Sequence, residues 1–71
     1  MNNITQIRRV YYVLLDDHGE PFLAESVRSN REINRGFRHG RTFVNKLMVC
    51  YTKEEGIKRF NFTREELGEP C

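Results

Sequence analysis

The sequence predicts a small α+β domain, in which an antiparallel sheet of about four strands carries one short helix on a face and is followed by a C-terminal helical turn. Three observations support this prediction. Two segments rich in apolar residues flank a cluster of turn formers, a capping pair then marks the start of a helix, and a second apolar segment follows. The expected element order is β-β-α-β-β.

The 71 residues are expected to form a single domain over 1–71, because a chain of this length buries only about 60% of the surface that its unfolded form exposes. Its hydrophobic fraction of 38% and charged fraction of 31% are compatible with a folded domain that has a small core. Small cores are often completed by a partner subunit, so a homodimer is one assembly that the sequence leaves open.

The first two strands are predicted at 7–15 and 22–29. The first segment, IRRVYYVLL, is dense in β-branched and aromatic residues, and the turn formers DDHGEP follow it. The second segment, FLAESVRS, alternates loosely between apolar and polar residues. This pattern favours a half-exposed return strand that closes a hairpin.

A short helix is predicted to follow Ser29. Ser29 and Glu32 have the spacing of a capping box, in which each side chain satisfies a backbone N–H of the other residue. Ile33 and Phe37 are four residues apart, so on a helix they share a face that can pack on the sheet. Gly40 is the expected end of this helix.

Two further strands and a terminal helical turn are predicted in the second half of the chain. Residues 42–51, TFVNKLMVCY, are the most apolar segment, and their β-branched content favours a strand. Residues 52–62 have two interpretations, a turn followed by a strand or a short helix capped by Thr52. We favour the turn and strand, because Gly56 disfavours a helix interior by roughly 1 kcal/mol relative to Ala. The final residues, TREELGEPC, predict one helical turn and a loose tail.

The charge is unevenly distributed, although the net charge is only +2. Residues 1–27 carry two basic and four acidic side chains, a net charge of −2, and residues 53–71 carry four basic and five acidic side chains, a net charge of −1. Residues 28–52 carry six basic side chains and one acidic one, a net charge of +5. Such asymmetry indicates a polyanionic partner, either nucleic acid or an acidic protein surface.

The candidate binding residues all lie in this basic third of the chain. In a helix over 30–38, the arginines at i, i+4 and i+7 would lie within about 60° of one another. Guanidinium groups bind phosphate through two parallel hydrogen bonds, so such a stripe can bridge successive phosphates. The same stripe also suits the solvated face of an ordinary surface helix. The predicted set comprises the stripe, two flanking arginines and a histidine that adds a donor: Arg28, Arg31, Arg35, Arg38, His39 and Arg41.

Other chemistry has little support. The turn DDHGEP holds four potential metal ligands but has no second ligand cluster, so neither a metal site nor another cofactor is expected. No Ser or Cys stands in a recognisable nucleophile context and no glycine-rich phosphate loop is present, so we do not expect an enzyme. Cys50 and Cys71 are expected to be free thiols.

No signal-peptide pattern and no span of about 18 apolar residues occurs, so a cytoplasmic location without a membrane is expected. The sequence therefore predicts a small non-enzymatic nucleic-acid-binding accessory or regulatory protein that contacts phosphates through an Arg-rich helix. The alternative is a protein-interaction module, such as an inhibitor or adaptor of a larger enzyme, that docks through the basic helix or an edge strand. Capture of a phosphorylated small molecule by the Arg and His cluster is a variant of the first hypothesis.

Overall fold

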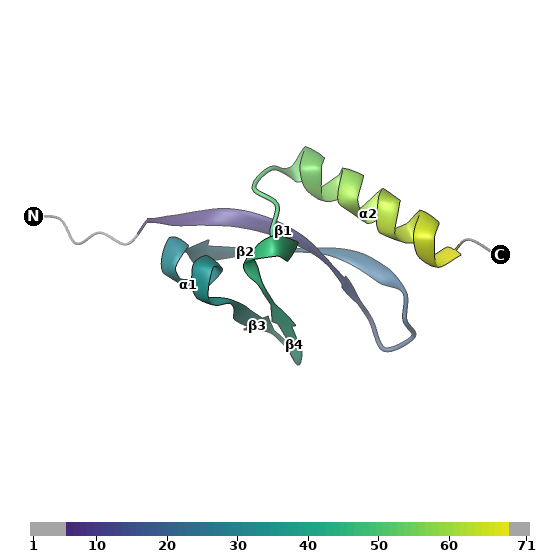
Figure 1. Ribbon diagram of the computed structural model, residues 1–71, viewed down its shortest axis with the longest axis horizontal. Helices are drawn as coiled ribbons and strands as arrows, with labels where there is room; N and C mark the ends of the chain where they lie inside the picture. The colour runs from purple at the N-terminus through teal and green to yellow at the C-terminus, as the bar shows by residue number, and fades with distance from the viewer. Residues whose placement is uncertain (1–5, 69–71) are drawn as a thin grey trace, which may run out of the picture.

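The computed structural model describes residues 6–68 and confirms the predicted α+β class (Figure 1). Its four strands form two antiparallel pairs, β1-β2 and β3-β4. The tail expected at 69–71, with Cys71, lies outside the described residues. The elements in order are β1 (Ile7–Leu15), β2 (Pro21–Ser29), α1 (Asn30–Arg35), β3 (Phe37–His39), β4 (Thr42–Val44), the 3-10 helix η1 (Lys46–Met48) and α2 (Lys53–Gly68).

The first hairpin is the predicted one, with its second strand beginning one residue earlier, at Pro21. Asp16 organises the turn, because its Oδ1 accepts the backbone N–H groups of His18 at 2.8 Å and of Glu20 at 2.9 Å. Gly19 has a φ of +78°, a conformation that L side chains rarely adopt. The side chain of Asp16 is therefore explained by turn chemistry.

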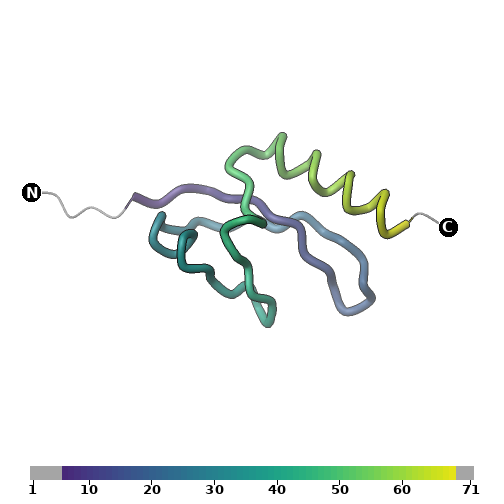
Figure 2. The backbone as a smooth tube through the Cα atoms, in the orientation of Figure 1, coloured from purple at the N-terminus to yellow at the C-terminus, as the bar shows by residue number. Residues whose placement is uncertain are grey.

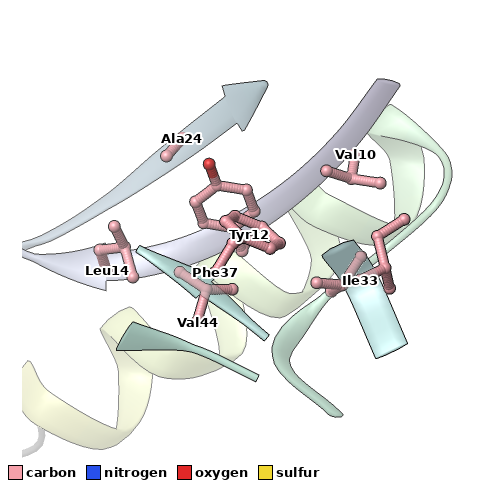
Figure 3. Packing of buried hydrophobic residues seen from close by; sticks show 8 residues of the cluster. Val10, Tyr12, Leu14, Ala24, Ile33, Phe37 and Val44 are labelled. Carbon is pink, nitrogen blue, oxygen red and sulfur yellow. The ribbon is translucent and has the colours of Figure 1, made fainter. Parts of the chain in front are cut away.

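The hydrophobic core lies on one face of the β1-β2 hairpin, where alternate residues of β1 point to the same side (Figure 3). α1 and the β3-β4 hairpin lie across this face (Figure 1, Figure 2). A single small core therefore holds both hairpins and the first helix together. Its members are Val10, Tyr12, Leu14, Ala24, Ile33, Phe37, Val44 and Val49.

The helix α1 is shorter than predicted. It ends at Arg35, because Gly36 adopts a φ of 93° and a ψ of 152°, which a helix cannot continue. The prediction of a helix over 30–38 with Gly40 as its end is therefore wrong. Phe37 does pack in the core, as expected, but it does so from the strand β3, and Gly40 instead takes a positive φ of 62° between β3 and β4.

The strand predicted over 42–51 is interrupted after Val44. Asn45 accepts the backbone N–H of Leu47 through its side chain at 2.9 Å and so caps the 3-10 helix η1. The chain returns to extended pairing only at Cys50, which exchanges two backbone hydrogen bonds with Tyr11 at 2.9 and 2.7 Å. Cys50 is a buried free thiol, as expected.

The prediction of a turn and strand over 52–62 is also wrong, because this segment belongs to the 16-residue helix α2. Thr52 accepts the backbone N–H of Glu55 at 3.2 Å, which is the capping interaction of the disfavoured alternative. α2 covers the face of β1-β2 opposite the core (Figure 2). Gly56 is buried there, and a Cβ on it would lie 2.9 Å from Tyr11 Cβ and 3.1 Å from Leu23 Cδ1. The residue that weakens the helix locally is thus the one that lets it approach the sheet.

Among residues 6–68, no helix is both long enough and apolar enough to span a bilayer.

Gly56→Ala is expected to destabilise the protein by about 1–2 kcal/mol, because overpacking against Tyr11 exceeds the roughly 1 kcal/mol that Ala gains in helix propensity. Gly68→Ala is the matched control, since a Cβ there meets nothing within 4 Å. Urea denaturation of both variants measures the difference. Equal stability of the two variants would contradict the close approach of α2 to the sheet.

Candidate functional site

The candidate site is the basic unit, which we define as residues 28–46: the end of β2, α1, the β3-β4 hairpin and the start of η1. This segment carries five arginines and one lysine but a single acidic residue, a net charge of +5. The helix α2, by contrast, carries four basic and four acidic residues and is neutral overall. All of the predicted site residues lie in the basic unit.

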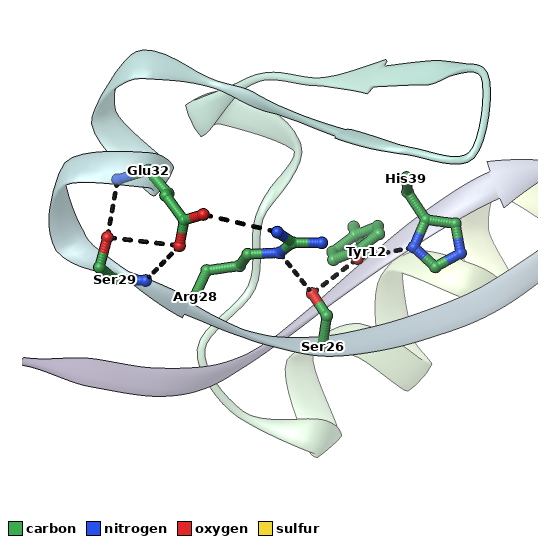
Figure 4. A network of polar contacts seen from close by, with 6 residues as sticks. All are labelled: Tyr12, Ser26, Arg28, Ser29, Glu32 and His39. Carbon is green, nitrogen blue, oxygen red and sulfur yellow. Dashed lines mark hydrogen bonds and ion pairs between the residues drawn. The ribbon is translucent and has the colours of Figure 1, made fainter.

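Arg28 is held inside the basic unit by three contacts (Figure 4). Its Nη1 lies 3.6 Å from Oε2 of Glu32, and its Nε donates to Oγ of Ser26 at 3.3 Å. The guanidinium carbon also lies 4.5 Å from the ring centroid of Phe37, at the edge of the core. Arg28 is therefore fixed in one position, with about a quarter of its side chain, 27%, still exposed.

The predicted capping box is confirmed and occupies the only acidic residue of the basic unit. Oγ of Ser29 accepts the backbone N–H of Glu32 at 3.1 Å, and Oε1 of Glu32 accepts the backbone N–H of Ser29 at 2.9 Å. This backbone hydrogen bond, followed by the charge of Arg28, lowers the pKa of Glu32 below its ordinary value of 4.5, although desolvation opposes the shift. The carboxylate thus stays ionised and is engaged at the start of α1.

His39 takes part in a hydrogen-bond network that joins the two hairpins (Figure 4). The hydroxyl of Tyr12 lies 2.8 Å from Oγ of Ser26 and 2.9 Å from Nδ1 of His39. Because Ser26 accepts a hydrogen bond from Arg28, its own hydroxyl can donate to Tyr12, which can in turn donate to Nδ1 of His39. The network engages Nδ1 of the imidazole ring, and His39 is thereby tied to the first hairpin.

The remaining four arginines are exposed, but they do not form the predicted helical stripe. Arg31 and Arg35 lie on α1, whereas Arg38 lies on β3 because the helix ends before it. Arg41 lies in the following turn, where its carbonyl oxygen accepts a hydrogen bond from Nη1 of Arg38 at 3.4 Å. Within residues 6–68, the ion pairs join Arg9 to Glu25 and Arg28 to Glu32, so none of these four arginines is neutralised by a protein carboxylate.

Arg8 is a further cationic residue that the sequence interpretation missed. It is directly opposite Arg28 in the β1-β2 register, so the two side chains leave the same face of the hairpin. Its guanidinium carbon lies 4.8 Å from the ring centroid of Tyr51. In the sequence, Arg8 belongs to the acidic first third, and only the strand register places it beside the basic unit.

A second feature is an open, largely apolar groove of about 570 Å³ between β1, η1 and α2. It lies along the edge of β1 beyond the Tyr11–Cys50 bridge. The backbone N–H and C=O groups of Val13 point to the same edge as those of Tyr11, because alternate residues of a strand share a direction. The main apolar residues of the groove are Val13, Leu14, Leu15, Leu47, Met48 and Leu67.

Among residues 6–68, no group of three or more His, Cys, Asp or Glu side chains is placed to hold a metal ion. Comparison with known proteins finds no matching family model, curated protein or solved structure.

Protonation of Glu32 is expected to weaken the fold in acid. Because its pKa is lowered in the folded state, the carboxylate stabilises the protein above its unfolded-state pKa, and this stability is lost as the pH falls through the folded-state value. Relative to wild type, Glu32→Gln should therefore be less stable at pH 7 and equally stable well below pH 4.5. Urea midpoints between pH 7 and pH 3 test this expectation.

Glu25→Gln is the control for this pH series, because its ion pair with Arg9 is exposed at the surface and contributes little. A difference between wild type and Glu32→Gln that does not change with pH would contradict the assigned role of Glu32.

Proposed function

We propose that the protein binds nucleic acid through phosphate contacts made by the exposed arginines of the basic unit, and that it acts in the cytoplasm as a small non-enzymatic accessory or regulatory factor. One observation carries the proposal. Four exposed guanidinium groups occupy a short helix and the adjoining hairpin, and the only carboxylate of the unit is engaged elsewhere. They are Arg31, Arg35, Arg38 and Arg41.

The basic unit has six basic residues and one acidic residue, and this balance differs from that of the other exposed elements of the described chain. The exposed Arg9 is paired with Glu25 at 2.8 Å, and the charges of α2 balance. Leaving several arginines without counter-charges costs stability through mutual repulsion. An anionic ligand removes this repulsion, and phosphate matches the guanidinium group in charge and in hydrogen-bonding geometry.

The fixed position of Arg28 supports the same proposal. The capping box, the ion pair with Glu32 and the contact with Phe37 attach the first turn of α1 to the core. Little conformational entropy would therefore be lost when the backbone of the unit meets a ligand. Only the long side chains of the exposed arginines would need to be ordered.

Binding to random-sequence oligonucleotides should weaken steeply as salt rises, with a log–log slope of about −0.7 to −0.9 per phosphate contact. The double variant Arg35→Gln, Arg38→Gln should bind more weakly and have a slope smaller by about two contacts. Fluorescence anisotropy from 50 to 300 mM salt measures both quantities.

The matched control is Lys53→Gln, Arg64→Gln, which removes the same charge from α2 and should retain wild-type binding. Absence of binding at about 50 mM salt would refute the proposal. Equal losses in the two double variants would show that net charge, and not the basic unit, drives binding.

The apolar groove favours a second candidate function, a protein-interaction module that accepts a strand along the open edge of β1. Leu47 is 84% exposed at its border, so Leu47→Glu should leave the fold intact. A defined protein partner that binds wild type stoichiometrically after nuclease treatment, and does not bind Leu47→Glu, would support this candidate. If the partner instead binds Leu47→Glu but not the Arg35→Gln, Arg38→Gln variant, its binding site is the basic unit.

A further inference from the structure

We infer that the exposed ring of Phe43 is a stacking platform for a nucleobase, and that the ligand of the basic unit is single-stranded nucleic acid. This inference rests on the proposed function and specifies its substrate class. It begins from the two faces of the β3-β4 hairpin.

The inner face of this hairpin is buried and its outer face is not. Phe37 and Val44 are directly opposite each other and belong to the core, with exposed fractions of 7% and 0%. Arg38 and Phe43 form the next pair in the register, so their side chains leave the other face. Phe43 is 51% exposed there. The basic unit thus presents one of its two phenylalanines to solvent.

The position of the Phe43 ring depends on Gly36. A Cβ atom on Gly36 would overlap Cζ of Phe43 and would lie within 3.0 Å of both Cε atoms. The tip of the ring therefore abuts the backbone of Gly36, where any side chain would displace it. The φ of 93° also requires a glycine at position 36. Gly36 therefore both ends α1 and leaves room for the ring of Phe43.

The Phe43 ring is half exposed and is not engaged by another aromatic ring or by a cation within residues 6–68. Within residues 6–68, the rings that carry a guanidinium group are those of Tyr51, Phe37 and Phe60. The aromatic pairs in the same part of the chain join Tyr12 to Phe37 and His39. Phe43 takes part in none of these contacts, so no guanidinium group or aromatic ring among residues 6–68 is stacked on it.

Three exposed arginines are close to Phe43, either in the strand register or along the sequence. Arg38 is its cross-strand neighbour, Arg41 lies two residues before it, and Arg35 directly precedes Gly36. Phe62 is a comparably exposed phenylalanine, but it lies on the electrically neutral α2. Lys58 and Arg59 lie beside Phe62, but Glu65 and Glu66 on the same helix offset their charge. An exposed ring with an excess of positive charge around it is therefore found at Phe43 and not at Phe62.

This combination is the one that single-stranded nucleic acids require. Their unpaired bases stack on aromatic side chains while cationic groups follow the backbone phosphates. In a duplex the bases are stacked on one another, so the ring would contribute little and only the arginines would bind. Stacking is tolerant of sequence because every base has a π face, and both DNA and RNA single strands fit it.

The first test compares wild type with Phe43→Leu, which keeps an apolar side chain but removes the aromatic face. Binding to labelled oligo(dT) and oligo(U) of 12 nucleotides should weaken by about 5- to 150-fold. Binding to a 12-base-pair duplex should change by less than about twofold. The two single strands distinguish DNA from RNA as the preferred ligand, and a preference for either supports the inference.

A second test uses the absence of tryptophan from the chain. Phe43→Trp introduces the only tryptophan of the chain at the proposed platform, and its emission, excited at about 295 nm where tyrosine absorbs little, should be quenched when oligo(dT) or oligo(U) binds but not when the duplex binds. Phe62→Trp is the matched control, since this side chain is 61% exposed on α2 and should not be quenched. This readout also applies if Phe43→Leu proves unstable.

The outcomes separate the inference from the proposed function. If Phe43→Leu binds single strands as wild type does and Phe43→Trp is not quenched, while Arg35→Gln, Arg38→Gln still loses affinity, then stacking is refuted and phosphate binding stands. Stronger binding of the duplex than of either single strand would also overturn the inference. If no nucleic acid binds at about 50 mM salt, both the inference and the proposed function fail.

Discussion

The hydroxyl group of Tyr12 is buried between the two hairpins, where it lies within hydrogen-bond distance of Ser26 on β2 and of His39 on β3. The bond to Ser26 lies within the first hairpin, whereas the bond to His39 forms only when the β3-β4 hairpin is docked, and a hydrogen bond of this kind contributes about 0.5–1.5 kcal/mol. The ring of Tyr12 adds edge contacts with Phe37 and His39, each at a centroid distance of 5.5 Å. One side chain of β1 therefore couples the position of the basic unit to the first hairpin.

The arginines are divided between those near the core and those at the surface. Arg8 and Arg28 are opposite each other in the sheet, and such like-charged pairs are unfavourable. Each has an aromatic neighbour, Tyr51 or Phe37, and Arg28 also has Glu32. The arginines of α1 and the β3-β4 hairpin have no such compensation from a carboxylate within residues 6–68. The exposed arginines of the basic unit thus lie in the segment with the largest excess of positive charge, where an anionic ligand would be most strongly attracted.

The elements that could be predicted from the sequence are those specified by local interactions. The first hairpin follows from its turn residues, and the start of α1 follows from Ser29 and Glu32. Either Gly36 or Gly40 could end the helix α1 as far as local sequence is concerned. The helix ends at Gly36 because Phe37 must dock in the core. Helix propensity at Gly56 disfavours α2, which the sequence offers only as the alternative over 52–62, whereas the contact of Gly56 with β1 decides the outcome.

The candidate site was predictable in composition but not in shape. The cluster of basic residues is visible in the sequence, and so are the arginines that carry it. Their division between a helix and a hairpin depends on where α1 ends, and the proximity of Arg8 depends on the strand register. The exposure of Phe43 depends on which face of the second hairpin meets the core, and a three-residue strand is too short for its alternation to show this.

The central claim is that the buried hydroxyl of Tyr12, through its hydrogen bond to His39, adds to the core contacts that hold the β3-β4 hairpin on the first hairpin. Amide hydrogen exchange of Tyr12→Phe, followed residue by residue, tests it most directly, with Tyr11→Phe on the opposite face of β1 as the control. The account predicts that protection falls in β3 and β4 in the Tyr12 variant while β1 and β2 retain most of theirs, and that the Tyr11 variant resembles wild type. Unchanged protection in β3 and β4, or an equal loss in all four strands, would contradict it.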